Sequence, residues 1–197
     1  KQLDQVLGKA KEKDLFFMEG MWTRCFPAVR TARKWLEEGK IGAPLTVRAS
    51  FDIKPALEEW QPWKGGRTHA AGALRDVGIY SLAMAFMVFP EGPKDIHSVD
   101  ESFHMLADYG EGKAAFLSGT FNQISNPVVE ITGEEGRILI GPEFWHPKEV
   151  ELITNKGEKE LFRDLYSATG FQYEIQEVQE CLREGRKESS CYTLEET

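Results

Sequence analysis

The residues with the clearest potential for chemistry lie in the run Gly72-Ala73-Leu74-Arg75-Asp76-Val77-Gly78-Ile79-Tyr80. Asp76 and Tyr80 are four positions apart, so a helix would place both on one face. A tyrosine hydroxyl acts as a general acid when its proton is accessible and its pKa is lowered, and a neighbouring carboxylate can orient the hydroxyl or the substrate. The same spacing also fits Asp76 as the cap of a buried helix and Tyr80 as a core aromatic. Spacing alone leaves both interpretations open.

The cysteine and histidine residues form no metal-binding pattern. Cys25, Cys181 and Cys191 are widely spaced, with no C-x-x-C pair and no Cys/His cluster, and the four histidines show no H-x-x-x-H pattern. We therefore expect no metal site. Three isolated cysteines are typical of reduced thiols, so we expect a cytoplasmic protein.

Four segments have the pattern of helices. Apolar residues at helical spacing mark the first and last of them, and Pro27 and Gly39 are suited to begin and end the second. The third is apolar nearly all round, which predicts a buried helix. The predicted helices cover 2–13, 27–39, 76–89 and 171–182, with a short buried strand at 15–18 and a loop at 60–71.

Strand-like runs fill the rest of the chain, and glycine-containing turns separate several of them. Helices followed by a meander of strands and a final helix predict an α+β fold, with an open, mainly antiparallel sheet of about six strands and helices on one face. The runs are 45–53, 96–109, 114–124, 128–132, 137–140, 150–154 and 160–162.

Size and charge exclude several classes of function. The chain has 197 residues and a net charge of −8, which disfavours binding to a nucleic-acid backbone. Its longest apolar stretch, 79–90, is too short to span a bilayer, so we expect no membrane association. The first residue is Lys1 rather than methionine, and we interpret the chain as part of a longer protein.

One face of the predicted sheet has no helix to cover it. The strand Ala114–Phe121 carries apolar residues on both faces and little charge. We predict that a second copy of the chain covers this face and forms a homodimer; the alternative is an ordinary solvated face with a few apolar residues. Leu117 or Phe121, whichever faces outward, would then lie in the interface.

The run from Gly72 to Tyr80 resembles the G-x-L-x-D-x-G-x-Y segment of the glucose–fructose oxidoreductase/inositol dehydrogenase family. The run 15–27, the turn Gly39-Lys40-Ile41-Gly42 and the hairpin Gly133-Glu134-Glu135-Gly136 are also similar to that family. Met21-Trp22-Thr23-Arg24, Trp145-His146-Pro147 and the stretch 181–189 resemble its dihydrodiol and D-xylose dehydrogenase branch. The resemblance covers essentially the whole chain.

The resemblance implies an oxidoreductase that transfers hydride between NAD or NADP and a cyclic diol or sugar. In that family a Rossmann domain binds the cofactor, and a C-terminal α+β domain forms the substrate wall and the dimer interface. The chain has neither the family's G-x-G-x-x-G nor its E-K-P motif. Residues 21–197 therefore resemble the family's C-terminal domain, and residues 1–20 resemble the last helix and strand of its Rossmann domain. We expect the chain to be inactive by itself. The alternative is a non-catalytic oligomerisation or ligand-sensing domain that has lost cofactor binding.

The resemblance also implies roles for individual residues. Tyr80 matches the catalytic tyrosine that exchanges a proton with the substrate oxygen, and Asp76 matches the acidic residue beside it. The aromatic residues Trp22, Phe51 and Trp145 match the substrate wall, and Arg75 is a further substrate-binding candidate. The alternatives are that Phe51 belongs to the core and Trp145 to an interface, and the segment Arg67-Thr68-His69 has no assigned role.

Overall fold

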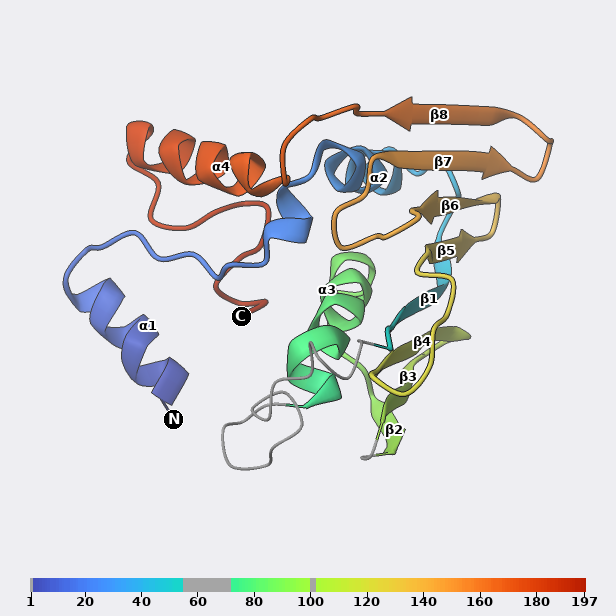
Figure 1. Ribbon diagram of the computed structural model, residues 1–197, viewed down its shortest axis with the longest axis horizontal. Coiled ribbons are helices and arrows are strands. Elements are labelled where there is room, and N and C mark those ends of the chain that lie inside the picture. The colour runs from blue at the N-terminus through green and yellow to red at the C-terminus, as the bar shows by residue number, and fades with distance from the viewer. Residues whose placement is uncertain (1, 55–71, 100–101) are drawn as a thin grey trace.

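The computed structural model describes residues 2–54, 72–99 and 102–197, and these form one sheet with helices on one side (Figure 1). The sheet has eight strands in the order β2-β3-β4-β1-β5-β6-β7-β8. Neighbours pair antiparallel except β1 and β4, which are parallel. The strands are β1 (Pro44–Asp52), β2 (Asp95–Val99), β3 (Phe103–Gly110), β4 (Lys113–Thr120), β5 (Val129–Gly133), β6 (Gly136–Ile140), β7 (Glu149–Thr154) and β8 (Lys159–Arg163).

The predicted α+β class is confirmed, and the strand number exceeds the expected six. The run 96–109, which reads as one strand, is the hairpin of β2 and β3. The sequence between the end of β2 and the start of β3 contains no glycine or proline, the residues that usually mark a turn in a sequence. The run 114–124 is shorter than expected, because β4 ends at Thr120.

The helical elements are α1 (Gln2–Glu12), η1 (Trp22–Cys25), α2 (Pro27–Glu37), η4 (Leu74–Gly78), α3 (Ile79–Val88) and α4 (Phe171–Arg183). Pro27 begins α2, where its missing N–H costs nothing. After α2 the chain turns at Gly39, whose φ of +67° favours glycine. The Gly39 N–H donates to the Leu36 carbonyl, and the Lys40 N–H donates to the Trp35 carbonyl. These two bonds give hydrogen-bond partners to carbonyl groups in the last turn of α2.

The core lies between the sheet and the two helices α2 and α3. α3 packs on β1 and β4 at the centre of the sheet, and α2 packs on β6 and β7. Side chains alternate along the strands, so every second residue enters this layer. Fully buried members include Val29, Met84, Val47, Ile131, Ile138, Ile140 and Val150.

The opposite face of the sheet has a mixed surface among the described residues. Phe116 faces outward on β4 and is 42% exposed, beside Arg48 on β1, whose guanidinium lies 4.9 Å from the Phe116 ring centroid. Neither residue expected to face outward does so. Leu117 is 4% exposed and packs under the helices, because it follows Phe116 and successive side chains of a strand point to opposite faces. Phe121 lies beyond the end of β4 and packs against the core.

The expected buried strand at 15–18 is wrong. The residues lie outside any sheet: the Leu15 N–H donates back to the Ala10 carbonyl at 2.9 Å, and the Phe17 N–H donates to the Lys187 carbonyl at 3.0 Å. A strand needs a row of such bonds to a neighbouring strand. The preceding helix α1 buries none of its residues and stands apart from the sheet in Figure 1.

Two glycines allow α3 and the turn before it to lie close to the sheet. A Cβ on Gly119 of β4 would lie 2.6 Å from the Gly78 backbone nitrogen, and a Cβ on Gly78 would lie 2.4 Å from the Phe103 ring. Only glycine fits at both positions. This contact fixes the height of η4 and of the first turn of α3 above β4.

None of the helices in the described part of the chain has the length and hydropathy needed to cross a bilayer.

Candidate active site

Asp76 and Tyr80 lie on consecutive turns that run directly into one another. Asp76 belongs to the π-helical turn η4, and Tyr80 is the second residue of α3. π-helical turns are rare and often occur at functional sites. Neither helical element has a side-chain hydrogen bond at its N-terminal cap, and no described residue donates to the buried Asp76 Oδ2. The interpretation of Asp76 as a helix cap therefore finds no support in the geometry.

The Tyr80 phenol lies at the edge of an aromatic cluster. The Trp22 indole N–H donates a hydrogen bond of 3.2 Å to Tyr80 Oη, and the Phe51 ring meets the Tyr80 ring edge-on at 5.3 Å. Trp145 stacks on Phe51 with ring centroids 3.8 Å apart and an angle of 3°. All three aromatic residues expected in the substrate wall thus gather around Tyr80.

Two residues of the short helix η1, Thr23 and Arg24, fasten this cluster to its surroundings. The Thr23 hydroxyl donates to the Trp145 carbonyl at 2.7 Å, and Arg24 donates to the Ala83 carbonyl on α3 at 2.8 Å. Arg24 is buried and also pairs with Glu196 at 3.0 Å. Burial lowers the pKa of the Arg24 guanidinium, and Glu196 opposes this effect. Trp22 is therefore held from both sides, between α3 and residue 145.

Two further rings complete the cluster and were not expected from the sequence. Phe171, the first residue of α4, stacks on Trp22 at 4.4 Å, and the His146 ring lies 6.2 Å from it. Gly170 brings α4 to this place, because its φ is +98° and a Cβ there would lie 2.2 Å from the Phe26 ring. The sequence could have indicated His146, because it directly follows Trp145, which was expected in the wall. Nothing in the sequence indicated Phe171 beyond its place on an amphipathic helix.

Arg75 does not join the aromatic cluster. It is exposed on η4 next to Asp76, and its part in substrate binding stays a prediction. The loop 60–71, with Arg67-Thr68-His69, lies outside the described residues. Within the described ranges, no three His, Cys, Asp or Glu side chains gather in a way that could hold a metal ion.

Comparison with known proteins identifies the family. The model of the GFO/IDH/MocA C-terminal domain matches residues 29–139, more than half of the chain. The chain belongs to the GFO/IDH/MocA family. This match includes Asp76 and Tyr80 and most of the sheet that supports them.

Relatives of this GFO/IDH/MocA chain extend beyond the matched region. The human trans-1,2-dihydrobenzene-1,2-diol dehydrogenase is 32% identical over the whole chain, which spans 62% of the length of that protein. A levoglucosan dehydrogenase in complex with NADH and levoglucosan has the same fold, with a TM-score of 0.83 at 18% identity, covering 98% of this chain and 63% of that one. The aldose-aldose oxidoreductase from Caulobacter crescentus has a TM-score of 0.77 at 19% identity, covering 94% and 59%.

Proposed function

We propose that this chain is the substrate-binding domain of a nicotinamide-dependent oxidoreductase that acts on a cyclic diol or a sugar. Tyr80 exchanges a proton with the substrate oxygen at which the hydride is transferred, and Asp76 orients the substrate or the phenol. Trp22, Phe51 and Trp145 form the flat apolar wall, and Arg75 contacts substrate at its rim. The human relative is named for a cyclic diol, and a structural relative is bound to levoglucosan.

One observation carries this proposal. The Tyr80 oxygen accepts its hydrogen bond from Trp22, and no described residue accepts the Tyr80 hydroxyl proton. One helical turn away, the buried Asp76 Oδ2 also lacks a partner among the described residues. A buried carboxylate oxygen without a hydrogen bond is costly, and such groups are retained where a ligand uses them. A substrate with two neighbouring hydroxyl groups offers a donor to the carboxylate and an oxygen to the phenol.

The aromatic wall fits the apolar face of a ring-shaped substrate. Stacked rings exclude water and present a flat surface, which suits the face of a cyclic diol or a sugar ring. Exclusion of water also strengthens the hydrogen bonds that hold the reacting oxygen. The wall thus binds and orients, while Tyr80 moves the proton.

NAD or NADP accepts or supplies the hydride. We propose that a preceding domain makes most of the contacts to this cofactor. The chain contains no glycine-rich dinucleotide motif, and the exposed α1 carries the apolar residues Leu3 and Val6 at its surface. We therefore assign residues 1–20 to the nucleotide-binding domain and 21–197 to the substrate and dimerisation domain. The chain is then inactive without that preceding domain.

We further propose that two copies associate through the open face of the sheet. A hollow of about 480 Å³ lies there over β3 and β4, lined by Leu106, Phe116, His104 and Ser118 among others. Exposed apolar side chains in such a hollow favour burial against a partner. The three free cysteines suit a reducing compartment, and we place the dimer in the cytoplasm.

An activity screen tests the function. The protein with its nucleotide-binding domain is assayed for reduction of NAD and of NADP with trans-dihydrodiols and with aldoses such as D-xylose. We expect turnover with one of these classes, and its loss when Tyr80 is replaced by phenylalanine. If the protein bound sugars or diols but reduced neither cofactor, the alternative of a ligand-sensing domain would replace this proposal. The dehydrogenase names of the relatives favour the enzyme.

A further inference from the structure

The last residues of the chain pack beside the candidate site. Met21, Ala83 and Tyr192 form a small buried cluster, and Tyr80 packs against it. Tyr192 comes from the C-terminal segment 188–197, while Ala83 lies on α3 about one turn after Tyr80. The C-terminal segment therefore lies next to the helix that carries the phenol.

The side chain of Arg24 connects the C-terminal segment to α3 and to η1. It is 3% exposed, and it pairs with Glu196 at 3.0 Å through Nη2. Its Nη1 donates to the Ala83 carbonyl at 2.8 Å, and its guanidinium carbon lies 5.4 Å from the centroid of the Tyr192 ring. A guanidinium is a rigid planar fork, so these contacts set where η1 lies along α3.

Glu196 is oriented by its own segment as well as by Arg24. Its Oε1 receives Arg24, whereas its Oε2 accepts the Thr193 N–H at 2.9 Å and the Thr193 hydroxyl at 3.2 Å. The Tyr192 hydroxyl donates to the Glu196 carbonyl at 2.8 Å. The carboxylate is thus held in place by the segment, and it supplies the negative charge that a buried guanidinium requires.

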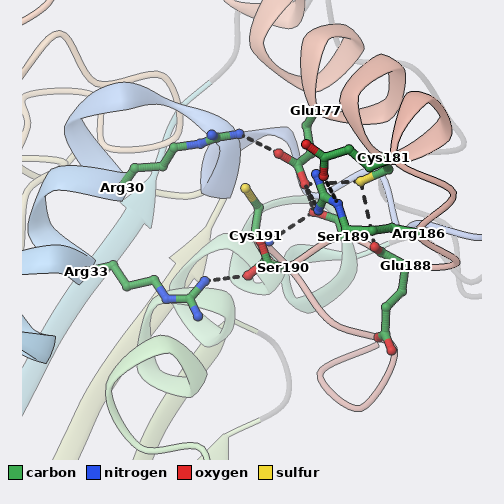
Figure 2. A network of polar contacts seen from close by, with 10 residues as sticks. Arg30, Arg33, Glu177, Cys181, Arg186, Glu188, Ser189, Ser190 and Cys191 are labelled. Atoms are coloured by element: carbon green, nitrogen blue, oxygen red, sulfur yellow. Dashed lines mark hydrogen bonds and ion pairs between the residues drawn. The ribbon is translucent and has the colours of Figure 1, made fainter.

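The C-terminal segment is fastened at its other end to α4 and α2. Figure 2 shows Ser189 donating to Glu177 on α4, at 2.7 Å, and Arg33 on α2 donating to the Ser190 carbonyl. The segment is therefore held at two places, at its first residues by α4 and α2 and at Glu196 by η1.

We propose that Arg24 and Glu196 are positioning residues, which set the hydrogen bond that Tyr80 receives. Trp22, the donor of that bond, belongs to the same four-residue helix as Arg24. Ala83 and Tyr80 lie within one turn of α3. The Arg24 contact with Ala83 therefore fixes how closely η1 approaches the Tyr80 oxygen. Glu196 acts through Arg24, because it balances the buried charge and holds one arm of the fork.

The Trp22 indole N–H reports the geometry of this bond without any turnover, in the protein with its nucleotide-binding domain. In NMR spectra of the N–H groups, the indole signal that disappears in Trp22→Phe belongs to Trp22. We expect Glu196→Gln to shift this signal in the same direction as Tyr80→Phe, because both weaken or remove the acceptor contact. Glu195→Gln is the matched control, since it makes the same charge change at the neighbouring, exposed residue. An indole signal that Glu196→Gln leaves in place would overturn the proposal.

Kinetics test the consequence for turnover, which rests on the proposed function. Because Glu196 acts through the Trp22 donor, Glu196→Gln should lower kcat by up to the roughly 2- to 12-fold expected for Trp22→Phe, with KM nearly unchanged. The double variant should be no slower than Trp22→Phe, since the two effects are not independent. An unchanged kcat, or effects that multiply, would refute the assignment. Absence of turnover in the wild type would instead refute the proposed function, and the indole signal would still decide whether the pair positions Trp22.

A second contact of the C-terminal segment separates positioning from stability. Ser189→Ala removes the hydrogen bond to Glu177, so it should lower the midpoint of thermal unfolding while kcat stays at the wild-type value. If Glu196→Gln does not fold, Glu196→Asp replaces it. The shorter side chain cannot keep both Arg24 and Thr193, so the indole signal should still shift. Equal losses of kcat in Ser189→Ala and in the Glu196 variant would show that the segment contributes stability alone, against the proposal.

Discussion

The Trp22 indole N–H donates a hydrogen bond of 3.2 Å to the Tyr80 hydroxyl oxygen, joining residues 58 positions apart in the chain. The bond occupies one lone pair of the phenol and leaves its proton to point elsewhere. Thr23 and Arg24, the next two residues of η1, hold Trp22 against residue 145 and α3. The donor to the Tyr80 oxygen is therefore positioned by a helix of four residues.

Removal of this hydrogen bond should slow turnover more than it weakens binding. Trp22→Phe keeps an aromatic ring against Phe171 and deletes the N–H donor together with part of the indole, a truncation that the control below shares. A single hydrogen bond contributes about 0.5–1.5 kcal/mol, so we expect kcat to fall roughly 2- to 12-fold with KM nearly unchanged. Trp35→Phe is the matched control, because it deletes the indole bond to Glu160, far from Tyr80. Equal effects of the two variants would show that Trp22 has no special role.

Loss of the Tyr80 hydroxyl should remove most of the activity and leave the fold intact. Tyr80→Phe retains the ring contact with Phe51, while a general acid–base group contributes ~10²–10⁴-fold to rate. Asp76→Asn should cost less, because an amide can still orient a hydroxyl. Steady-state kinetics measure both, and circular dichroism checks the fold. Turnover of Tyr80→Phe within a few-fold of wild type would remove Tyr80 from the mechanism.

A charge on the open sheet face should dissociate the proposed dimer. Phe116→Asp replaces an exposed ring that lines the hollow over β3 and β4 with a carboxylate, and in a two-fold interface the change occurs twice. Sedimentation velocity should then show monomers, since the interface loses two apolar rings and has to dehydrate two carboxylates. Leu165→Asp is the control, because Leu165 is 84% exposed in a loop away from this face. Dimers that survive Phe116→Asp, or a monomeric wild type, would refute the sheet-face interface.

Acid should destabilise the C-terminal segment through Glu177. Burial opposes its ionisation, but hydrogen bonds from Ser189 and Cys181 and the charge of Arg30 outweigh it and lower the pKa of Glu177 to about 2. A depressed carboxyl pKa stabilises the fold above the ordinary value of 4.5, and the contribution is lost as the pH falls from there toward 2. The lost contribution is on the order of 3 kcal/mol.

Denaturant unfolding across this pH range measures the Glu177 contribution. Glu177→Gln should lower the free energy of unfolding near neutral pH and flatten its acid dependence between 4.5 and 2. Glu180→Gln, at an exposed position of the same helix, should change neither. Parallel acid profiles of the wild type and Glu177→Gln would contradict the assignment.

Local patterns in the sequence were sufficient for most elements of the fold. Proline at the start of α2, glycine after its end and the apolar surface of α3 each act over a few residues, so they can be read without a structure. The prediction of a strand at 15–18 was wrong because it depended on a contact outside the run. An apolar run becomes a strand only beside a hydrogen-bonding neighbour, and the sequence of the run does not contain that neighbour.

At the candidate site, too, local patterns could be interpreted from the sequence and contacts between distant segments could not. The spacing of Asp76 and Tyr80 follows from one helical turn, and the resemblance to a known family supplied Trp22, Phe51 and Trp145. The sequence thus determined the class of fold, and with that resemblance it predicted Asp76 and Tyr80 as the acid–base pair and the three aromatic residues as the substrate wall. Only the tertiary structure decided that Trp22 donates to Tyr80, that Phe171 and His146 join the cluster, and that Phe116 rather than Leu117 faces outward. Each of these depends on strand register or on contacts between distant segments, and packing of the whole chain sets both.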